Sequence, residues 1–435
     1  MTKKTILIIL TVLALVLVCA CTGENYNSFK PLTMPTGSAV VNNGGLVVRI
    51  GEYTYFVNGV VAATGDNTYN KVTEGAICRI KTDDIMKEKP LVEIVVPKIC
   101  YQGEVSSTGL FVKKDRIYFT TPSVEKNNNG EIKNSELQVM SAKFDGSGVE
   151  VYLSIPVNTI AVYLMDSGEG VYCVYLNGDK VMGAQLQKNA KATELAKDIT
   201  AIKIDGKDVY MTQKIKYKNA QDEDMDETYN KLLKFSIGGK VVELLDGSKA
   251  VANVPDIMYA LVTAADGKIY YTATGAVEAY AGTFVYDTKE KRLSQTANTS
   301  ILPYKEGFLM VNGSFVCYIT YNEETKVTTS TKMIYTSSWT PKFIVDNYAY
   351  YVNSNILYKA ELNEEKISEG KALHTTTMTA TTVSYDVIGT DVFFVSSANS
   401  KIYVANFEKV EGKDDKIVET LVAYVVEEKK IDEKN

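Results

Sequence analysis

The chain has 435 residues, of which 45% are apolar, 10% aromatic and 23% charged, and its formal net charge is −6 at pH 7. These proportions predict a folded globular body and exclude a largely disordered chain. The acidic balance argues against nucleic acid or another polyanion as a partner.

The first twenty residues have the layout of an export signal. Lys3 and Lys4 precede an apolar run at residues 6–18, which is too short for an ordinary spanning helix. The run ends in V-C-A-C at residues 18–21, which resembles the lipobox of bacterial lipoproteins. The resemblance implies removal of residues 1–20, lipidation of Cys21, and a location on the bacterial cell membrane facing outside the cytoplasm. A signal cleaved without lipidation and a retained single anchor are the alternatives.

A short phrase recurs along the chain, in which an acidic or glycine turn leads into a β-branched and aromatic run. Its clearest copy is D-G-K-I-Y-Y-T at residues 266–272, and related copies occur at 115–120, 205–211, 346–351 and 390–395. Such a repeat predicts an array of small sheets. Each unit divides into four short extended runs, which is how a blade of a β-propeller is built.

We therefore predict an all-β fold, an eight-bladed β-propeller of four-stranded antiparallel blades over residues 45–426. The mean of about 48 residues per unit is usual for a blade. Seven blades is the alternative, if the unit at 160–197 or at 302–334 is an elaboration of its neighbour. A pair of β-sandwiches or a β-solenoid is disfavoured because sandwiches do not repeat one phrase and solenoid repeats are shorter. Only 190–197 and 223–233 have helix-forming composition, and both are short.

The segments that flank the propeller have separate expected roles. Residues 21–44 are predicted to be a polar tether followed by a possible closing strand, and residues 427–435 a charged tail. The extended run at 37–41 is expected to pair with the outer strand at 417–424, which would protect the edge of the last blade.

Two phrases carry a resemblance to a known class of propellers. The copy at 266–272 and the run I-L-Y-K-A-E-L at 356–362 resemble repeats of bacterial lipoproteins and secreted proteins with low-density-lipoprotein-receptor-like propellers or propellers of a domain of unknown function. The resemblance covers most of residues 45–426. Because its motifs build blades, it implies a fold and no activity.

Cysteine usage gives no disulfide framework. After Cys21 the remaining cysteines are Cys78, Cys100, Cys173 and Cys317, too few for a chain of this length. They are expected to be buried thiols within strands, and pairing of Cys78 with Cys100 in the first repeat stays open.

The candidate catalytic and metal-binding groups favour structural interpretations. An acid recurs at the turn between the first and second strands of the units, at Asp115, Asp166, Asp205, Asp266, Asp346 and Asp391. Catalytic carboxyl pairs need different pKa values, whereas turns commonly use the same acid in every repeat. The acidic run at 222–227 lacks the glycine and the distal glutamate of a calcium loop. With His374 as the single histidine, we predict no catalytic residue, metal or cofactor.

The predicted function is a protein- or glycan-binding or scaffolding module. Long connections between second and third strands, at 58–75, 122–136 and 213–230, are expected on one face of the disc, where binding loops usually lie. The predicted ligand-binding aromatics in these loops and in the links between blades are Tyr69, Tyr101, Tyr217, Tyr229 and Trp339. An enzyme that acts on extracellular glycans, a glycosidase or lyase, is the alternative.

Overall fold

The computed structural model describes residues 24–418 except 60–66, 86, 88–89, 101–107, 125–135, 158, 160, 220, 249–256, 276–280, 288, 295–300, 313–314, 323, 326, 336–339, 354–355, 363–370, 373–384, 390, 396–401 and 409–415. Regular structure in these residues consists of antiparallel strands and two 3₁₀ turns, η1 (Tyr26–Ser28) and η2 (Thr82–Asp84). No helix in the described ranges is long and apolar enough to cross a bilayer.

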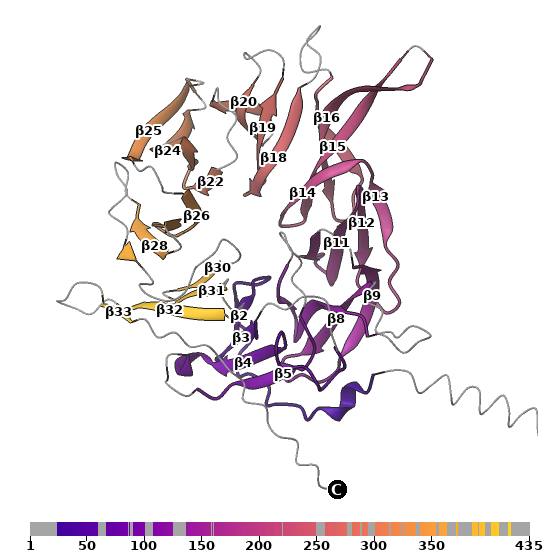
Figure 1. The fold of residues 1–435 in the computed structure, drawn as a ribbon, viewed down its shortest axis with the longest axis vertical. Coiled ribbons are helices and arrows are strands. Elements are labelled where there is room, and N and C mark those ends of the chain that lie inside the picture. Colours follow the sequence, from indigo (N-terminus) through magenta and orange to yellow (C-terminus); the bar gives the residue numbers. More distant parts are fainter. Residues whose placement is uncertain are drawn as a thin grey trace, which may run out of the picture.

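The strands form small sheets arranged in a ring (Figure 1), seven of them four-stranded and the N-terminal one five-stranded. The N-terminal sheet contains β1 (Val40–Val41), β2 (Val47–Ile50), β3 (Tyr53–Val57), β4 (Ile77–Lys81) and β5 (Glu93–Val96). The next contains β6 (Phe111–Lys113), β7 (Arg116–Pro122), β8 (Glu136–Lys143) and β9 (Glu150–Pro156). It is followed by β10 (Ala161–Asp166), β11 (Val171–Asn177), β12 (Lys180–Gln185) and β13 (Thr193–Ala196).

The ring continues with sheets of the same order. They are β14 (Ile199–Asp205), β15 (Asp208–Lys218), β16 (Asp224–Ser236) and β17 (Val241–Asp246), then β18 (Met258–Ala265), β19 (Lys268–Thr274), β20 (Gly282–Tyr286) and β21 (Glu290–Ser294). Next are β22 (Ile301–Tyr304), β23 (Gly307–Asn312), β24 (Phe315–Asn322) and β25 (Val327–Tyr335). The last two sheets are β26 (Thr340–Val345), β27 (Tyr348–Asn353), β28 (Ile356–Glu361) and β29 (Lys371–Ala372), and β30 (Tyr385–Ile388), β31 (Asp391–Val395), β32 (Ile402–Glu408) and β33 (Lys416–Val418).

In every sheet each strand pairs with its neighbour in sequence. The described chain is therefore an all-β propeller of antiparallel blades, which confirms this part of the predicted fold. The recurring phrase explains the local geometry: Asp266 and Gly267 have φ angles of +53° and +73° and join β18 to β19 in a two-residue turn. Two successive positive φ angles give a turn whose twist matches that of the flanking strands, and acidic residues and glycine tolerate them.

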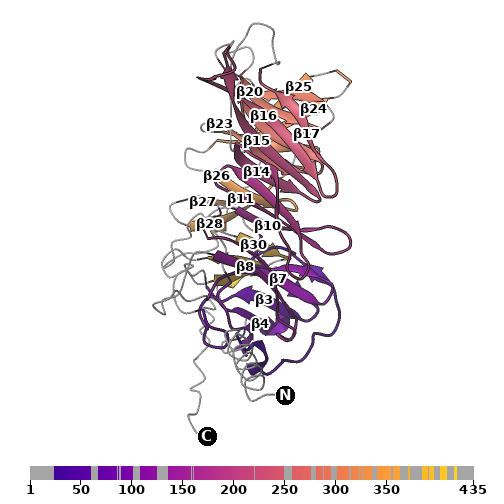
Figure 2. The same ribbon diagram turned by 90° about the vertical axis from the view of Figure 1, so that its right-hand side faces the viewer.

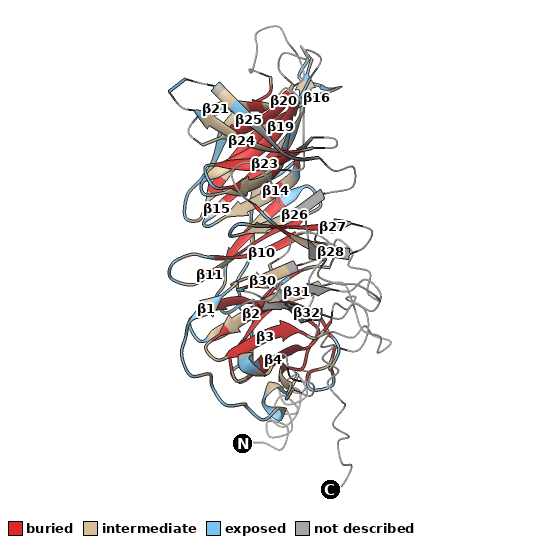
Figure 3. Ribbon diagram, turned by 90° about the vertical axis from the view of Figure 1, so that its left-hand side faces the viewer, coloured by how far each residue is buried: buried red, intermediate tan, exposed pale blue. Residues whose placement is uncertain are grey.

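The core lies between neighbouring sheets. One apolar cluster joins Leu137 and Val139 of β8 to Leu164 of β10 and Cys173 of β11, and similar clusters occupy the other described interfaces. All five residues of β3 are buried, and five of the seven in β19. Burial on both sides explains why such strands are apolar at most positions on both faces. Figure 3 shows this buried zone along the strands and exposed residues at the turns.

Two segments with helix-forming composition are extended strands. The segment at 190–197 contains β13, and the segment at 223–233 lies largely in β16. Each strand pairs with the preceding strand of its sheet, β12 and β15 respectively. Cross-strand pairing supplies hydrogen bonds and packing that outweigh a weak helical propensity over so short a stretch.

The described part of the ring shows no strand exchange between its two ends. Val40 of β1 pairs with Ile50 of β2, and β33 pairs with β32, so within the described residues the 37–41 segment does not pair with the outer strand. Residues 419–424 of the predicted partner lie outside the described residues. A hairpin to the adjacent β2 closes a much shorter loop than pairing with the end of the chain. The last sheet instead meets the first through side chains: Ile388 and Phe393 share an apolar cluster with β2 and β3, and Arg49 bonds Asp391 at 2.8 Å.

None of the described cysteines forms a disulfide. Cys78, Cys100 and Cys173 are buried, and Cys317 is partly buried. Burial raises the pKa of Cys173 to about 12. The pairing left open between Cys78 and Cys100 is therefore absent, and these thiols serve as small apolar side chains.

Candidate binding surface

One hairpin extends beyond its sheet. Strands β15 and β16 have 11 and 13 residues. Their neighbour β14 pairs with β15 only as far as Gln213, and β17 pairs with β16 only from Lys231 onwards. Beyond these points β15 and β16 continue as a two-stranded ribbon, residues 214–219 and 221–230, which we call the arm. The arm projects past the rim of the ring (Figure 1).

The sequence prediction of a loop at 213–230 is therefore wrong. Most of these residues are paired strands, with Lys214 opposite Asn230 and Lys216 opposite Thr228. Alternation of lysine with apolar residues along β15 is a period of two, which signals a strand with one polar and one apolar face. That signal is visible in the sequence once the segment is considered as a strand.

The two faces of the arm differ in chemistry. On one face Ile215 lies opposite Tyr229, and the rings of Tyr217 and Tyr229 have centroids 4.7 Å apart. All three side chains remain partly exposed. The other face carries Lys214 and Lys216, both exposed. The arm thus presents a small aromatic surface that no other part of the described chain covers completely.

The tip and the base of the arm are held by polar contacts. At the tip, the Asn219 side chain accepts hydrogen bonds from the backbone N–H of Gln221 and Glu223, both at 2.9 Å. At the base, Lys231 bonds Glu243 at 2.8 Å and lies 6.0 Å from the centre of the Tyr229 ring. The hydrogen bond to Glu243 raises the pKa of Lys231. The lysine therefore stays charged beside the aromatic surface.

The acidic run at 222–227 belongs to this tip. Lys218 pairs with Asp222 at 3.2 Å, and Lys216 lies 3.9 Å from Asp224. Among the described residues no group of three or more histidine, cysteine or acidic side chains has a metal-binding arrangement. The carboxylates of the run thus contribute to the hairpin turn through exposed ion pairs, which are individually weak.

The other predicted binding aromatics do not join Tyr217 and Tyr229. Tyr69 is 5% exposed and packs edge-on against Tyr26, with ring centroids 5.1 Å apart. Burial, with the nearby Glu24 carboxylate, raises the pKa of Tyr69 to about 12. Its prediction as an exposed contact is wrong because the N-terminal residues fold over it. Tyr101 and Trp339 lie outside the described residues.

Two of the turn acids, Asp166 and Asp205, connect neighbouring sheets. Asp166 bonds Lys113 of the preceding sheet at 2.6 Å, and the Asp205 carboxylate accepts the backbone N–H of Gly267 in the following sheet at 2.6 Å. The bond from Lys113 lowers the pKa of Asp166. Each of these two acids therefore lies at a different interface between sheets. Their structural role is to link one blade to the next.

Comparison with known proteins adds only a fold-level likeness. No protein-family profile and no curated protein sequence matches the chain. A prolyl endopeptidase structure matches with a TM-score of 0.42 and 12% identity over 86% of this chain and 54% of that one, so the chain spans about half its length. The β-propeller domain of the Trilobed protease from Pyrococcus furiosus matches with a TM-score of 0.41 and 8% identity over 88% of this chain and 98% of that one. A protein from Lactobacillus plantarum matches with a TM-score of 0.38 and 10% identity over 84% and 95%.

Proposed function

We propose that this protein is an extracytoplasmic β-propeller, anchored through a lipid on Cys21, that binds a protein partner with the apolar face of its arm. In this proposal the five-stranded sheet serves as the first blade, which makes the ring eight-bladed. The ring supplies a rigid support, and the arm supplies the recognition surface.

The observation that carries the proposal is the partly exposed cluster of Ile215, Tyr217 and Tyr229 on a projecting ribbon. Tyrosines on a rigid element bury large areas at small entropic cost, which is why they are common in interface centres. From Asp224 to Tyr229, β16 pairs only with β15 among the described strands. An extended segment of another protein can add to such an edge, which favours a protein over a glycan as the ligand.

Capture of a partner tests the role of the arm. The full-length protein would be cross-linked in membranes and its partner identified, and binding of that partner would then be measured with the double variant Tyr217→Ala and Tyr229→Ala. We expect affinity to fall at least tenfold, because two central aromatic contacts are lost. The matched control is Lys216→Gln with Thr228→Ala on the opposite face, which should bind normally. Equal affinity of both double variants, or a glycan as the captured ligand, would contradict the proposed interface.

Membrane fractionation tests the anchor. Cys21→Ser should release the protein from membranes or block its maturation, because the acceptor thiol is lost. Cys19→Ser is the matched control and should leave fractionation unchanged. If Cys21→Ser stayed in the membrane with the wild-type mass, the lipid anchor would be wrong.

A further inference from the structure

The residues that directly follow the lipidation motif are docked on the propeller. Residues 24–34, which we call the strap, contain η1 and run along the N-terminal sheet. Tyr26, Phe29 and Leu32 pack against the apolar cluster of that sheet. The backbone N–H of Leu32 donates to the Asp145 carbonyl at 2.9 Å, and Arg79 donates to the Thr33 carbonyl at 2.6 Å. The predicted tether at the start of the mature chain is therefore wrong from Glu24 onwards.

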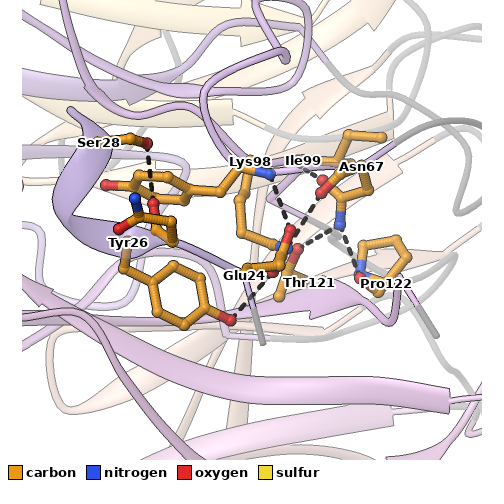
Figure 4. A network of polar contacts seen from close by, with 10 residues as sticks. Glu24, Tyr26, Ser28, Asn67, Lys98, Ile99, Thr121 and Pro122 are labelled. Atoms are coloured by element: carbon orange, nitrogen blue, oxygen red, sulfur yellow. Dashed lines mark hydrogen bonds and ion pairs between the residues drawn. The ribbon is translucent and has the colours of Figure 1, made fainter. Parts of the chain in front are cut away.

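A buried ion pair secures the end of the strap (Figure 4). Lys98 has no exposed side-chain area and donates to the Glu24 carboxylate at 2.5 Å and to the Asn67 carbonyl at 3.0 Å. The other oxygen of Glu24 accepts the backbone N–H of Tyr69 at 2.8 Å, and the Tyr26 hydroxyl donates to Glu24 at 3.0 Å.

This arrangement gives the strap a strong preference for the docked state. Undocking Glu24 would leave Lys98 as a buried cation without its carboxylate, and removing one partner of a buried ion pair is strongly destabilising. The strap is therefore part of the folded body.

The position of Glu24 limits the reach of the anchor. Only Thr22 and Gly23 separate it from Cys21. Three residue steps span at most about 11 Å. A lipid on Cys21 is thus held close to the point where Glu24 meets Lys98. The strap and the arm lie at opposite ends of the long axis of the ring (Figures 1 and 2).

We infer that the strap holds the N-terminal sheet against the lipid surface and keeps the arm at the end of the molecule farthest from it. This inference rests on the proposed lipidation of Cys21. It assigns a membrane-facing edge to the ring and presents the binding surface to partners away from the bilayer.

Fluorescence quenching by lipid headgroups tests the orientation. A fluorophore would be attached at Asn27→Cys on the strap or at Gln221→Cys on the arm, both exposed positions, in a Cys317→Ser background that removes the partly exposed thiol. The full-length lipidated protein would be placed in phosphatidylethanolamine–phosphatidylglycerol vesicles that contain a headgroup quencher. We expect quenching at residue 27 to exceed that at residue 221 severalfold.

Lengthening the link provides the matched control. Twenty glycine and serine residues inserted between Gly23 and Glu24 add about 25 Å of flexible reach and leave the strap itself intact. Quenching at residue 27 should then fall towards the value at residue 221. Equal quenching at both positions before the insertion, or no change after it, would overturn the inference.

The lipid itself is checked separately by the intact mass of the same preparation. A protein that carries no lipid on Cys21 would overturn the proposed anchor and this inference with it. A lipidated protein with equal quenching at residues 27 and 221 would overturn the orientation alone and leave the anchor in place.

Discussion

Asp386 makes one of the most distant contacts in sequence, and it lies where the last sheet meets the first. Its carboxylate accepts the backbone N–H of Val47 at 2.9 Å. A Cβ atom on Gly45 would overlap the Asn42 amide and lie 2.8 Å from the Asp386 carboxylate oxygen, so a larger residue there would displace these side chains. Burial raises the pKa of Asp386, and hydrogen bonds from Asn42 and Val47 oppose the rise. The Asp386 carboxylate therefore accepts backbone N–H groups of the first sheet, although burial disfavours its charged form.

This raised pKa predicts a pH dependence of stability. The folded state binds the Asp386 proton more tightly than the unfolded state, so the contribution is fully present below the unfolded pKa and is lost as pH rises through the folded pKa. Asp386→Asn cannot titrate. The melting temperature of the wild type should thus fall relative to that of Asp386→Asn as pH rises from the ordinary carboxyl range upwards.

Thermal denaturation at a series of pH values measures this difference. Asp346→Asn, at an exposed turn between β26 and β27, is the matched control for removing one carboxylate. A constant difference between the wild type and Asp386→Asn across the series would show that Asp386 does not titrate with folding.

At the scale of one element, the arm is an appendage to its sheet. Beyond Gln213 and Lys231 it is two-stranded, and the core clusters on either side of this sheet include none of Ile215, Tyr217 and Tyr229. Replacing residues 215–229 by Asn-Gly, which favours a two-residue hairpin turn, should therefore change the free energy of unfolding by less than about 1 kcal/mol. Partner capture should be lost. Chemical denaturation checks the first expectation, and a large loss of stability would show that the arm belongs to the folding core.

At the scale of the whole molecule, the closure between the last and first sheets depends on side-chain packing. Phe393 is 3% exposed and belongs to the same cluster as residues of β2 and β3. Phe393→Ala should lower the free energy of unfolding by about 3–5 kcal/mol, because it removes a large buried side chain and leaves a cavity. Denaturation of the full-length protein measures the effect. Val242→Ala, at a position 50% exposed, should change it by less than about 0.5 kcal/mol.

The packing between the last and first sheets also determines how far local unfolding extends in the Phe393→Ala variant. An opened ring exposes the facing sides of two sheets, so Phe393→Ala should broaden the transition or divide it, with the strands near the junction unfolding first. Faster hydrogen exchange in both β2 and β31 would support this expectation. A change confined to β31 would mean that the first sheet does not depend on the last.

The sequence by itself determined the features of this protein that depend on near neighbours. Turn residues such as Asp266 and Gly267 accept positive φ angles whatever surrounds them, and four apolar runs per unit can bury their surfaces only as packed sheets. The propeller, its turns and its thiol cysteines were accordingly predictable. The aromatic pair Tyr217 and Tyr229 was singled out, although its setting was taken for a loop.

Only the tertiary structure decided the features that join distant parts of the chain. Lys98 meets Glu24 across 74 positions, and Asp386 meets Val47 across 339. Such contacts depend on where the whole ring places two segments, which no local pattern encodes. Tyr69 was therefore predicted to be exposed and is buried. Val40 and Val41 pair with the adjacent β2. Residues 24–34, predicted as a tether, form a docked strap because the ring places Lys98 beside Glu24.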